Sequence, residues 1–139
     1  MSRRRRLALA GLAALVGGSG VLHLVVPRPY LRIVPAPLTS WRSEVVIVSG
    51  IAEILCALLL LLPRTRRIGA YATAALLVAV FPANVQMALD GGVGDAGFPA
   101  NSAALAWLRL PLQVPLIWWA LSFARAAPTQ PGEAVNSVT

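Results

Sequence analysis

The chain has 139 residues, of which 58% are hydrophobic and only 12% are charged. A soluble domain of this length could not bury so much apolar surface in one core, so the composition favours a protein covered by lipid. The formal net charge of +7 comes from 12 basic residues, all arginines, and most of them lie at the ends of apolar runs. That pattern is typical of membrane orientation, and it argues against a nucleic-acid-binding surface.

Four apolar runs follow one another along the chain, at residues 7–26, 44–62, 68–89 and 103–124. Each is close to the roughly 20 residues that a helix needs to cross about 30 Å of hydrocarbon. The sequence therefore predicts an all-α fold, an integral membrane four-helix antiparallel bundle that forms one domain over residues 7–125. Residues 1–6 form a basic segment before it, and residues 126–139 form a tail of disordered composition.

The arginines predict the orientation of this bundle. Most of them border the runs on one side of the predicted fold: Arg3–Arg6, Arg64, Arg66, Arg67 and Arg125. The positive-inside rule then places both termini in the cytoplasm. Three others belong to the opposite side, so the bias is incomplete: Arg28, Arg32 and Arg42.

Residue usage and the first segment bear on localisation. Lysine is absent whereas alanine and arginine are abundant, which is typical of GC-rich bacterial genomes, so we expect the plasma (inner) membrane of a bacterium. The opening MSRRRRLALAGLAALVGG also resembles a signal peptide, even of the twin-arginine type. A cleaved signal ends in a small-residue site, but this chain continues as SGVLHLVVP without a clear one. We therefore expect the first helix to be retained.

Two connections are expected on the outer side of the membrane. The first, PRPYLRIVPAPLTSWRSE, contains four prolines, which predict extended or turn structure rather than a regular helix. Its Tyr30 and Trp41 are placed to anchor it at the level of the lipid headgroups. The second, DGGVGDAGFPANS, is glycine-rich and predicts a flexible linker, after which Asn101 or Ser102 is expected to cap the fourth helix.

Five polar or charged residues lie inside the apolar runs: His23, Glu53, Asn84, Arg109 and Gln113. Glu53 is near the middle of its run, about 13 Å from either end at 1.5 Å per residue. An acid or an arginine at the centre of a membrane helix costs about 3 kcal/mol on insertion scales, so it needs a partner or a use. The five residues come from four different helices and fall in the outer half of the predicted bundle.

Together these residues predict a polar pocket. Arg109 and Gln113 are four residues apart and share a helix face, whereas Glu53 is on a face of small residues that lets helices approach closely. We therefore expect Arg109 to face Glu53, with His23, Asn84 and Gln113 around the pair. Three simpler interpretations stay open: an interfacial histidine, an arginine that extends to the surface, and amides that only hydrogen-bond across helices.

Several short motifs occur along these helices. They are GIAEI at residues 50–54, LLPRTRR after it, VFPAN at residues 80–84 and RLPLQ at residues 109–113, preceded by His23 and a proline-rich segment. In this order and spacing they resemble the DoxX family of small four-helix membrane proteins, over about residues 20–125. The resemblance implies a four-helix fold and a link to membrane redox complexes, since the family is named after a subunit of a thiosulfate:quinone oxidoreductase. Distant eukaryotic relatives are linked to membrane-protein assembly.

The favoured function is a subunit or accessory of a membrane redox system, with a quinone-like headgroup bound in an outward-facing pocket. Arg109 and Gln113 would hydrogen-bond a carbonyl, and Glu53 or His23 would move a proton. Two alternatives stay open. One is a non-catalytic assembly or partner factor, in which the charged pair only fixes helix packing, and the other is a small transporter.

The sequence argues against two further kinds of chemistry. Cys56 is the only cysteine, so there is no CxxC pair for a self-contained thiol-redox enzyme. One histidine, one glutamate and one cysteine on separate helical turns do not form a readable metal site. The expected partners are the lipid bilayer and other membrane proteins, with no nucleic acid, and whether the protein is itself an enzyme is left open.

Overall fold

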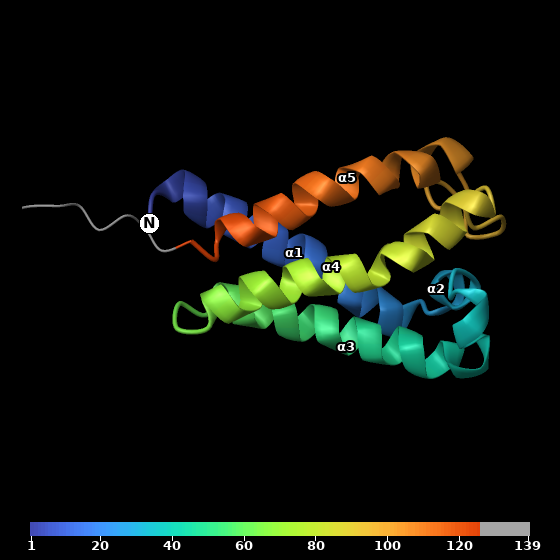
Figure 1. Ribbon diagram of the computed structural model, residues 1–139, viewed down its shortest axis with the longest axis horizontal. Helices are drawn as coiled ribbons and strands as arrows, with labels where there is room; N and C mark the ends of the chain where they lie inside the picture. Colours follow the sequence, from blue (N-terminus) through green and yellow to red (C-terminus); the bar gives the residue numbers. More distant parts are fainter. Residues whose placement is uncertain (126–139) are drawn as a thin grey trace, which may run out of the picture.

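Four long helices make up most of the structure, a computed structural model that describes residues 1–125 (Figure 1). They are α1 (Arg3–Val25), α3 (Arg42–Leu61), α4 (Arg66–Leu89) and α5 (Ala103–Ser122). All four are long and apolar enough to cross a membrane. Each coincides with one of the predicted apolar runs, with bounds that differ by a few residues. No β-strand occurs within residues 1–125, so the all-α prediction is confirmed for this part of the chain.

Serine side chains explain where two of these helices begin. Ser2 Oγ accepts a hydrogen bond from the backbone N–H of Arg5, 3.3 Å away, so α1 starts within the run of arginines. Ser102 Oγ accepts in the same way from Leu105 at the start of α5, over 3.4 Å. Each hydroxyl satisfies one of the N–H groups that a helix start leaves without a partner. Of the two caps expected for α5, Ser102 is the one observed.

The proline-rich connection is more helical than its prolines predict. It contains α2 (Arg28–Arg32) and a 3-10 helix, η1 (Ala36–Trp41), so the expectation of extended or turn structure is wrong for these two segments. Pro29 and Pro37 lie within the first two positions of their helices. A proline is tolerated there because its missing N–H has no partner in the first turn anyway, and its fixed φ suits a helix.

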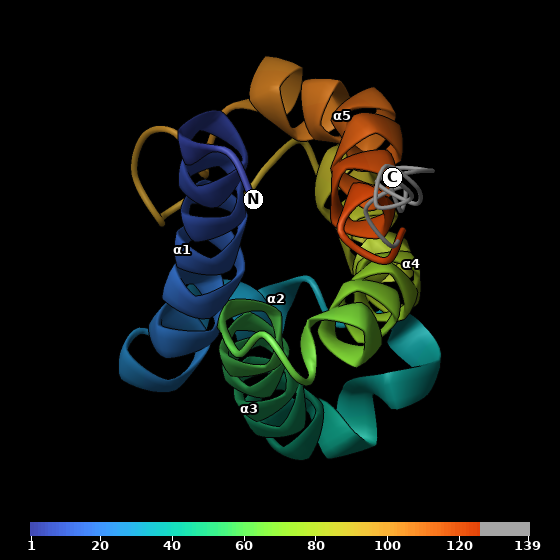
Figure 2. The same cartoon turned by 90° about the vertical axis from the view of Figure 1, so that its left-hand side faces the viewer.

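The long helices pack in chain order around a common centre. α1 contacts α3, α3 contacts α4, and α4 contacts α5. Figure 2 looks at the end of the molecule that holds the N-terminus and shows the four helices surrounding that centre. The main apolar core draws on all four of them, and its most completely buried members are Leu12, Leu60, Ala70 and Ala120.

The two ends of the molecule differ in what they carry. The N-terminus, the α3–α4 connection and the end of α5 lie at one end, here called the N-terminal end, and α2, η1 and the α4–α5 connection lie at the other, the α2 end (Figure 1). At the N-terminal end, Arg5 Nη2 donates to the carbonyl oxygen of Ser122 over 3.0 Å, and Arg66 Nε donates to that of Leu60 over 3.0 Å. These guanidinium groups stabilise the carbonyl-rich, negative ends of α5 and α3.

Large apolar side chains cover the outside of the helices. Leu7, Val78, Val114 and Trp118 are each between 59% and 69% exposed. Exposure of this kind around four long helices is unfavourable in water and favourable in hydrocarbon. The surface therefore fits helices that are long and apolar enough to cross a membrane.

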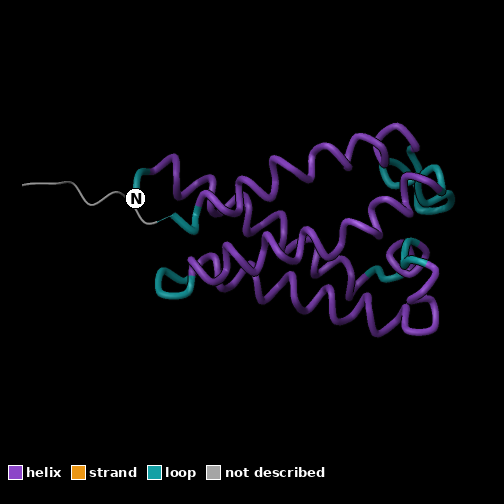
Figure 3. The backbone as a smooth tube through the Cα atoms, in the orientation of Figure 1, coloured by secondary structure: helices purple, strands orange, loops and turns teal. Residues whose placement is uncertain are grey.

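The helices separate toward the α2 end. α4 contains Pro82, which cannot donate the helical hydrogen bond to Val78, and the second half of this helix leans away from α3 toward α5 (Figure 3). A second, smaller core fills part of the α2 end, formed by Met87, Ala88, Val93 and Ala106. The rest of this end lines a cavity that is partly open to the outside.

Candidate functional site

A cavity of about 500 Å³ lies at the α2 end. Its walls come from the last turn of α1, from α2 and the residue after it, from the second half of α4, from the α4–α5 connection and from the first half of α5. Nearly all of the lining residues are apolar; the exceptions are Arg109 and Tyr30. The volume lies within the range of small-molecule sites, and an apolar chamber with a few polar groups is the usual form of such a site.

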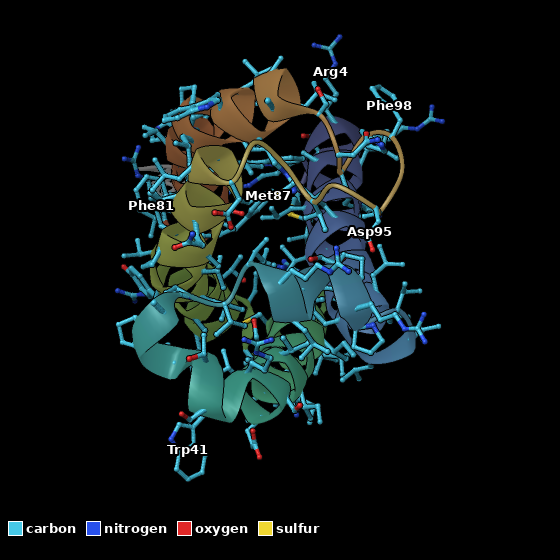
Figure 4. The ribbon with its side chains drawn as sticks, turned by 90° about the vertical axis from the view of Figure 1, so that its right-hand side faces the viewer. Arg4, Trp41, Phe81, Met87, Asp95 and Phe98 are labelled. Atoms are coloured by element: carbon cyan, nitrogen blue, oxygen red, sulfur yellow. The ribbon has the colours of Figure 1, made fainter. Side chains whose placement is uncertain are left out.

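Arg109, an exposed residue of α5, lines this cavity. Its Nη1 lies 3.5 Å from Met87 Sδ, across from α4, and Figure 4 shows Met87 directed into the space between the helices. Within residues 1–125, no acidic side chain forms an ion pair with Arg109. Its five N–H groups therefore have donor capacity to spare for a ligand with carbonyl, carboxylate or phosphate oxygens.

The expected contact between Arg109 and Glu53 is not present, and this prediction is wrong. Glu53 is buried, with 8% of its surface exposed, and it faces His23 on α1. Its Oε2 lies 3.2 Å from His23 Nδ1. The physical reason is that α3 packs directly against α1, whereas α5 packs against α4 and lies away from α3 at this depth.

Two glycines set the close approach of α1 and α3. A Cβ atom on Gly20 would lie 2.5 Å from the carbonyl oxygen of Gly50, and one on Gly50 would lie 2.8 Å from His23 Cβ. Neither position can carry a side chain without moving a backbone, so the helices meet at glycine. The contact brings His23 and Glu53 side by side, and it explains why Glu53 has a partner on the nearest helix.

The His23–Glu53 pair is incompletely hydrogen-bonded. His23 Nδ1 donates to the carbonyl oxygen of Ser19, one turn earlier in α1, over 2.8 Å. Glu53 Oε2 is buried without a hydrogen bond from any described residue, although it lies close to the same nitrogen. A buried carboxyl oxygen without a donor is costly, so this pair can take up a proton or accept a hydrogen bond from a further group.

Tyr30 separates this pair from the cavity. Its ring stacks on the imidazole of His23, with 3.7 Å between centroids and 26° between planes, and it also lines the cavity. Burial raises the pKa of the Tyr30 hydroxyl group, the charge of Glu53 raises it further, and Arg109 opposes the rise. The Tyr30 ring therefore lies between His23 and the cavity. The sequence alone indicates only headgroup anchoring for Tyr30, because nothing in its pattern shows that α2 folds over the end of α1.

Asn84 and Gln113 form a separate link between α4 and α5. Asn84 Nδ2 donates to Gln113 Oε1 over 3.0 Å, and Gln113 Nε2 donates to the carbonyl oxygen of Leu77. Gln113 is buried, and neither residue lines the cavity. The five predicted residues thus divide into three places: His23 with Glu53, Asn84 with Gln113, and Arg109 in the cavity.

An ion pair that sequence analysis did not predict joins the two connections at the α2 end. Arg32 binds Asp95 through two nitrogens and two oxygens, with 2.6 Å between Nη2 and Oδ2. The signal available in the sequence was weak: an arginine in one outer connection and an aspartate in the other. Their pairing depends on the α4–α5 connection folding back over α2.

Over residues 1–125 these features define an all-α protein with four long helices apolar enough to cross a membrane and with a largely apolar, partly open cavity near one end. The chain belongs to the family described as a domain of unknown function (DUF8561), which matches residues 12–124. That range begins within α1 and ends just after α5, so it includes the second half of α1, the other three long helices and the residues that line the cavity. No curated protein and no solved structure matches the chain.

Proposed function

We propose that the chain is a multi-pass protein of the bacterial plasma (inner) membrane, an antiparallel four-helix bundle with both termini in the cytoplasm. Its distribution of arginines supports this orientation. Arg3–Arg6, Arg64, Arg66 and Arg67 lie at the N-terminal end, which would be cytoplasmic. The α2 end and its cavity would then open toward the outer side.

Cysteine labelling on intact cells tests this orientation. In a Cys56→Ser background, a single cysteine at position 98 is expected to react with a membrane-impermeant maleimide, whereas one at position 2 is expected to react only after lysis. Phe98 is 81% exposed, so the first site is accessible if it faces outward. Labelling at position 2 and none at position 98 in intact cells would reverse the orientation.

We further propose that the protein is a subunit or accessory of a quinone-linked membrane redox system, rather than a stand-alone enzyme, and that it is related to the DoxX family through the four motifs. The observation that carries the ligand proposal is the apolar cavity with Arg109 in its wall. The apolar lining suits a quinone ring and the start of its tail. The guanidinium N–H groups suit a quinone carbonyl, and the Tyr30 hydroxyl offers a second donor.

The neighbouring His23–Glu53 pair supports a proton role beside such a ligand. The pair does not line the cavity, but Tyr30 contacts His23 on one side and the cavity on the other. In this proposal the pair holds or releases a proton at Glu53 Oε2, the oxygen that has no hydrogen bond among residues 1–125. Asn84 and Gln113 act on helix packing and not on the ligand.

Binding of decylubiquinone to the purified protein in detergent tests the ligand proposal, with quenching of tryptophan fluorescence as the readout. Arg109→Gln is expected to weaken binding by at least about tenfold, since a hydrogen bond from a charged group contributes about 1.5–3 kcal/mol and about 1.4 kcal/mol is a factor of ten. Arg42→Gln, on the exposed first turn of α3 and outside the cavity, serves as the matched control. Equal affinities for the unsubstituted protein and Arg109→Gln would contradict the proposal.

Native purification distinguishes a quinone-binding subunit from an assembly or partner factor that binds no quinone. Quinone extracted with the unsubstituted protein, and lost with Arg109→Gln, supports the redox proposal. A copurifying membrane protein whose yield is unchanged by Arg109→Gln, with no quinone present, would favour an assembly or partner factor instead.

A further inference from the structure

The cavity is open where α1 and α5 border it. Its lining residues on α2 and α4 are buried or half-buried, whereas both of those at the end of α1 and most of those on α5 are exposed. The large apolar residues among the exposed ones are each between 46% and 52% exposed: Leu22, Val26, Leu108 and Leu112. Ala96 and Pro99 of the α4–α5 connection are exposed as well, so the opening also reaches the α2 end.

α1 and α5 meet at the N-terminal end and separate toward the α2 end. At the N-terminal end, Arg5 donates to the carbonyl oxygen of Ser122. One turn or more further along α1, a Cβ atom on Gly11 would lie 3.7 Å from the Trp119 ring. At the α2 end, Figure 4 shows the end of α1 (blue) and the start of α5 (orange) apart, with the α4–α5 connection crossing between them. These two helices do not pack along their length, unlike α1 with α3 and α4 with α5.

The opening extends along the apolar part of α5. Leu112 follows Ala103, the first residue of α5, by nine positions, which is about 13 Å along the helix at 1.5 Å per residue. In a bilayer with about 30 Å of hydrocarbon, this depth is close to the middle. Leucine and valine side chains on both edges of the opening suit contact with lipid chains better than contact with water. The cavity therefore faces hydrocarbon through this opening when the four helices span a membrane.

Arg109 makes an empty opening of this kind costly. It is exposed on the same side and follows Ala103 by six positions, about 9 Å along α5. Its Nη1 lies near Met87 Sδ, and a thioether sulfur is a weak acceptor. A guanidinium group at this depth needs stronger acceptors, and lipid chains offer none. A molecule that has both an oxygen-bearing headgroup and an apolar chain satisfies Arg109 and the leucines around it together.

We propose that the cavity opens sideways into the bilayer between α1 and α5, and that its ligand lies across this opening. The headgroup contacts Arg109, and the apolar chain passes between the two helices into the surrounding lipid. This inference rests on the proposed quinone function and narrows it to quinones with a long tail that stays in the membrane. Such a ligand enters from the lipid, and the connections at the α2 end do not have to move.

Photochemical labelling from the lipid tests the opening without any quinone. The full-length protein is placed in nanodiscs that contain phosphatidylcholine with a diazirine midway along one acyl chain, irradiated and mapped by mass spectrometry. Val78 and Trp118 are exposed outside the cavity and should carry adducts in any case. Met87 lines the cavity and is only 3% exposed, so lipid around the outside of the helices does not reach it. Adducts on Met87 are expected, because a chain that enters between α1 and α5 contacts it.

Two pairs of substitutions show whether the chain enters between these helices. Leu22→Trp with Leu112→Trp narrows the opening from both edges and should lower the yield of Met87 adducts by about threefold or more, because an indole ring fills much of the space that a chain needs. Val21→Trp with Val114→Trp adds the same side chains to exposed positions of the same helices outside the cavity. This control should leave the yield unchanged, and adducts on Val78 normalise both measurements.

The lateral opening is refuted if Met87 of the unsubstituted protein carries no adducts, or if both double variants give the same yield. Decylubiquinone added before irradiation then tests the occupant. It should lower the Met87 adducts and leave those on Val78 unchanged, because its tail takes the place of the lipid chain. Met87 adducts that depend on Leu22 and Leu112 but not on decylubiquinone would retain the opening and reject a quinone as its occupant.

Discussion

Replacing Gly20 with valine is expected to lower the midpoint of thermal unfolding in detergent by many degrees or to prevent folding. Any side chain at this position meets the backbone of α3, because a Cβ atom would lie 2.5 Å from the Gly50 carbonyl oxygen. It would also lie 2.9 Å from Glu53 Cβ. Overpacking a well-filled interior costs about 1–3 kcal/mol, and a clash with backbone atoms is at the upper end or beyond. Circular dichroism during heating measures the effect.

Gly18 provides the matched control within the same helix. A Cβ atom there would meet nothing within 4 Å, so Gly18→Ala should be neutral or slightly stabilising, since alanine favours a helix over glycine. If Gly20→Val and Gly18→Ala had the same midpoint, α1 and α3 would not meet at glycine. The arrangement of His23 beside Glu53 would then lose its structural basis.

The sequence predicts the helices well because the signal for them is local. Each apolar run is long, interrupted by few charges, and bordered by arginines or by a serine that can cap a helix. The proline-rich connection is harder to predict. Proline is disfavoured in the interior of a helix but favoured in its first turn. The same prolines are therefore compatible with a loop and with the short helices α2 and η1.

The site could be predicted only in part, because its geometry depends on which helices are neighbours. The sequence identifies Glu53 and Arg109 as costly residues inside apolar runs, but their depth alone does not tell which partner each one meets. The partner of Glu53 depends on the Gly20–Gly50 contact, which selects α1 as the neighbour of α3. The cavity and the Arg32–Asp95 pair depend on how two connections fold over the helix ends. The hydrophobic periodicity of the sequence does not predict how these connections fold.

Glu53 is expected to be energetically coupled to His23, its neighbour on α1. Glu53→Gln and His23→Ala, made separately, should each lower the free energy of unfolding in mixed micelles, by up to about 3–5 kcal/mol, because each leaves the other member of a buried pair uncompensated. The double variant should lose less than the sum, since neither partner then remains stranded. We expect a coupling energy of at least about 1 kcal/mol for residues in direct contact.

The same cycle with Arg109 supplies the contrast. Arg109 lines the cavity and shares no hydrogen bond or ion pair with Glu53 in the described part of the chain. The effects of Glu53→Gln and Arg109→Gln should therefore add to within about 0.5 kcal/mol. Arg109→Gln should also lower the free energy of unfolding only slightly, because removing the guanidinium group does not leave a buried carboxylate without its partner. A coupling larger with Arg109 than with His23 would mean that the two charged residues meet in the membrane after all. Arg109 would then be neutralised within the protein, and the cavity would have no spare cation with which to hold a ligand.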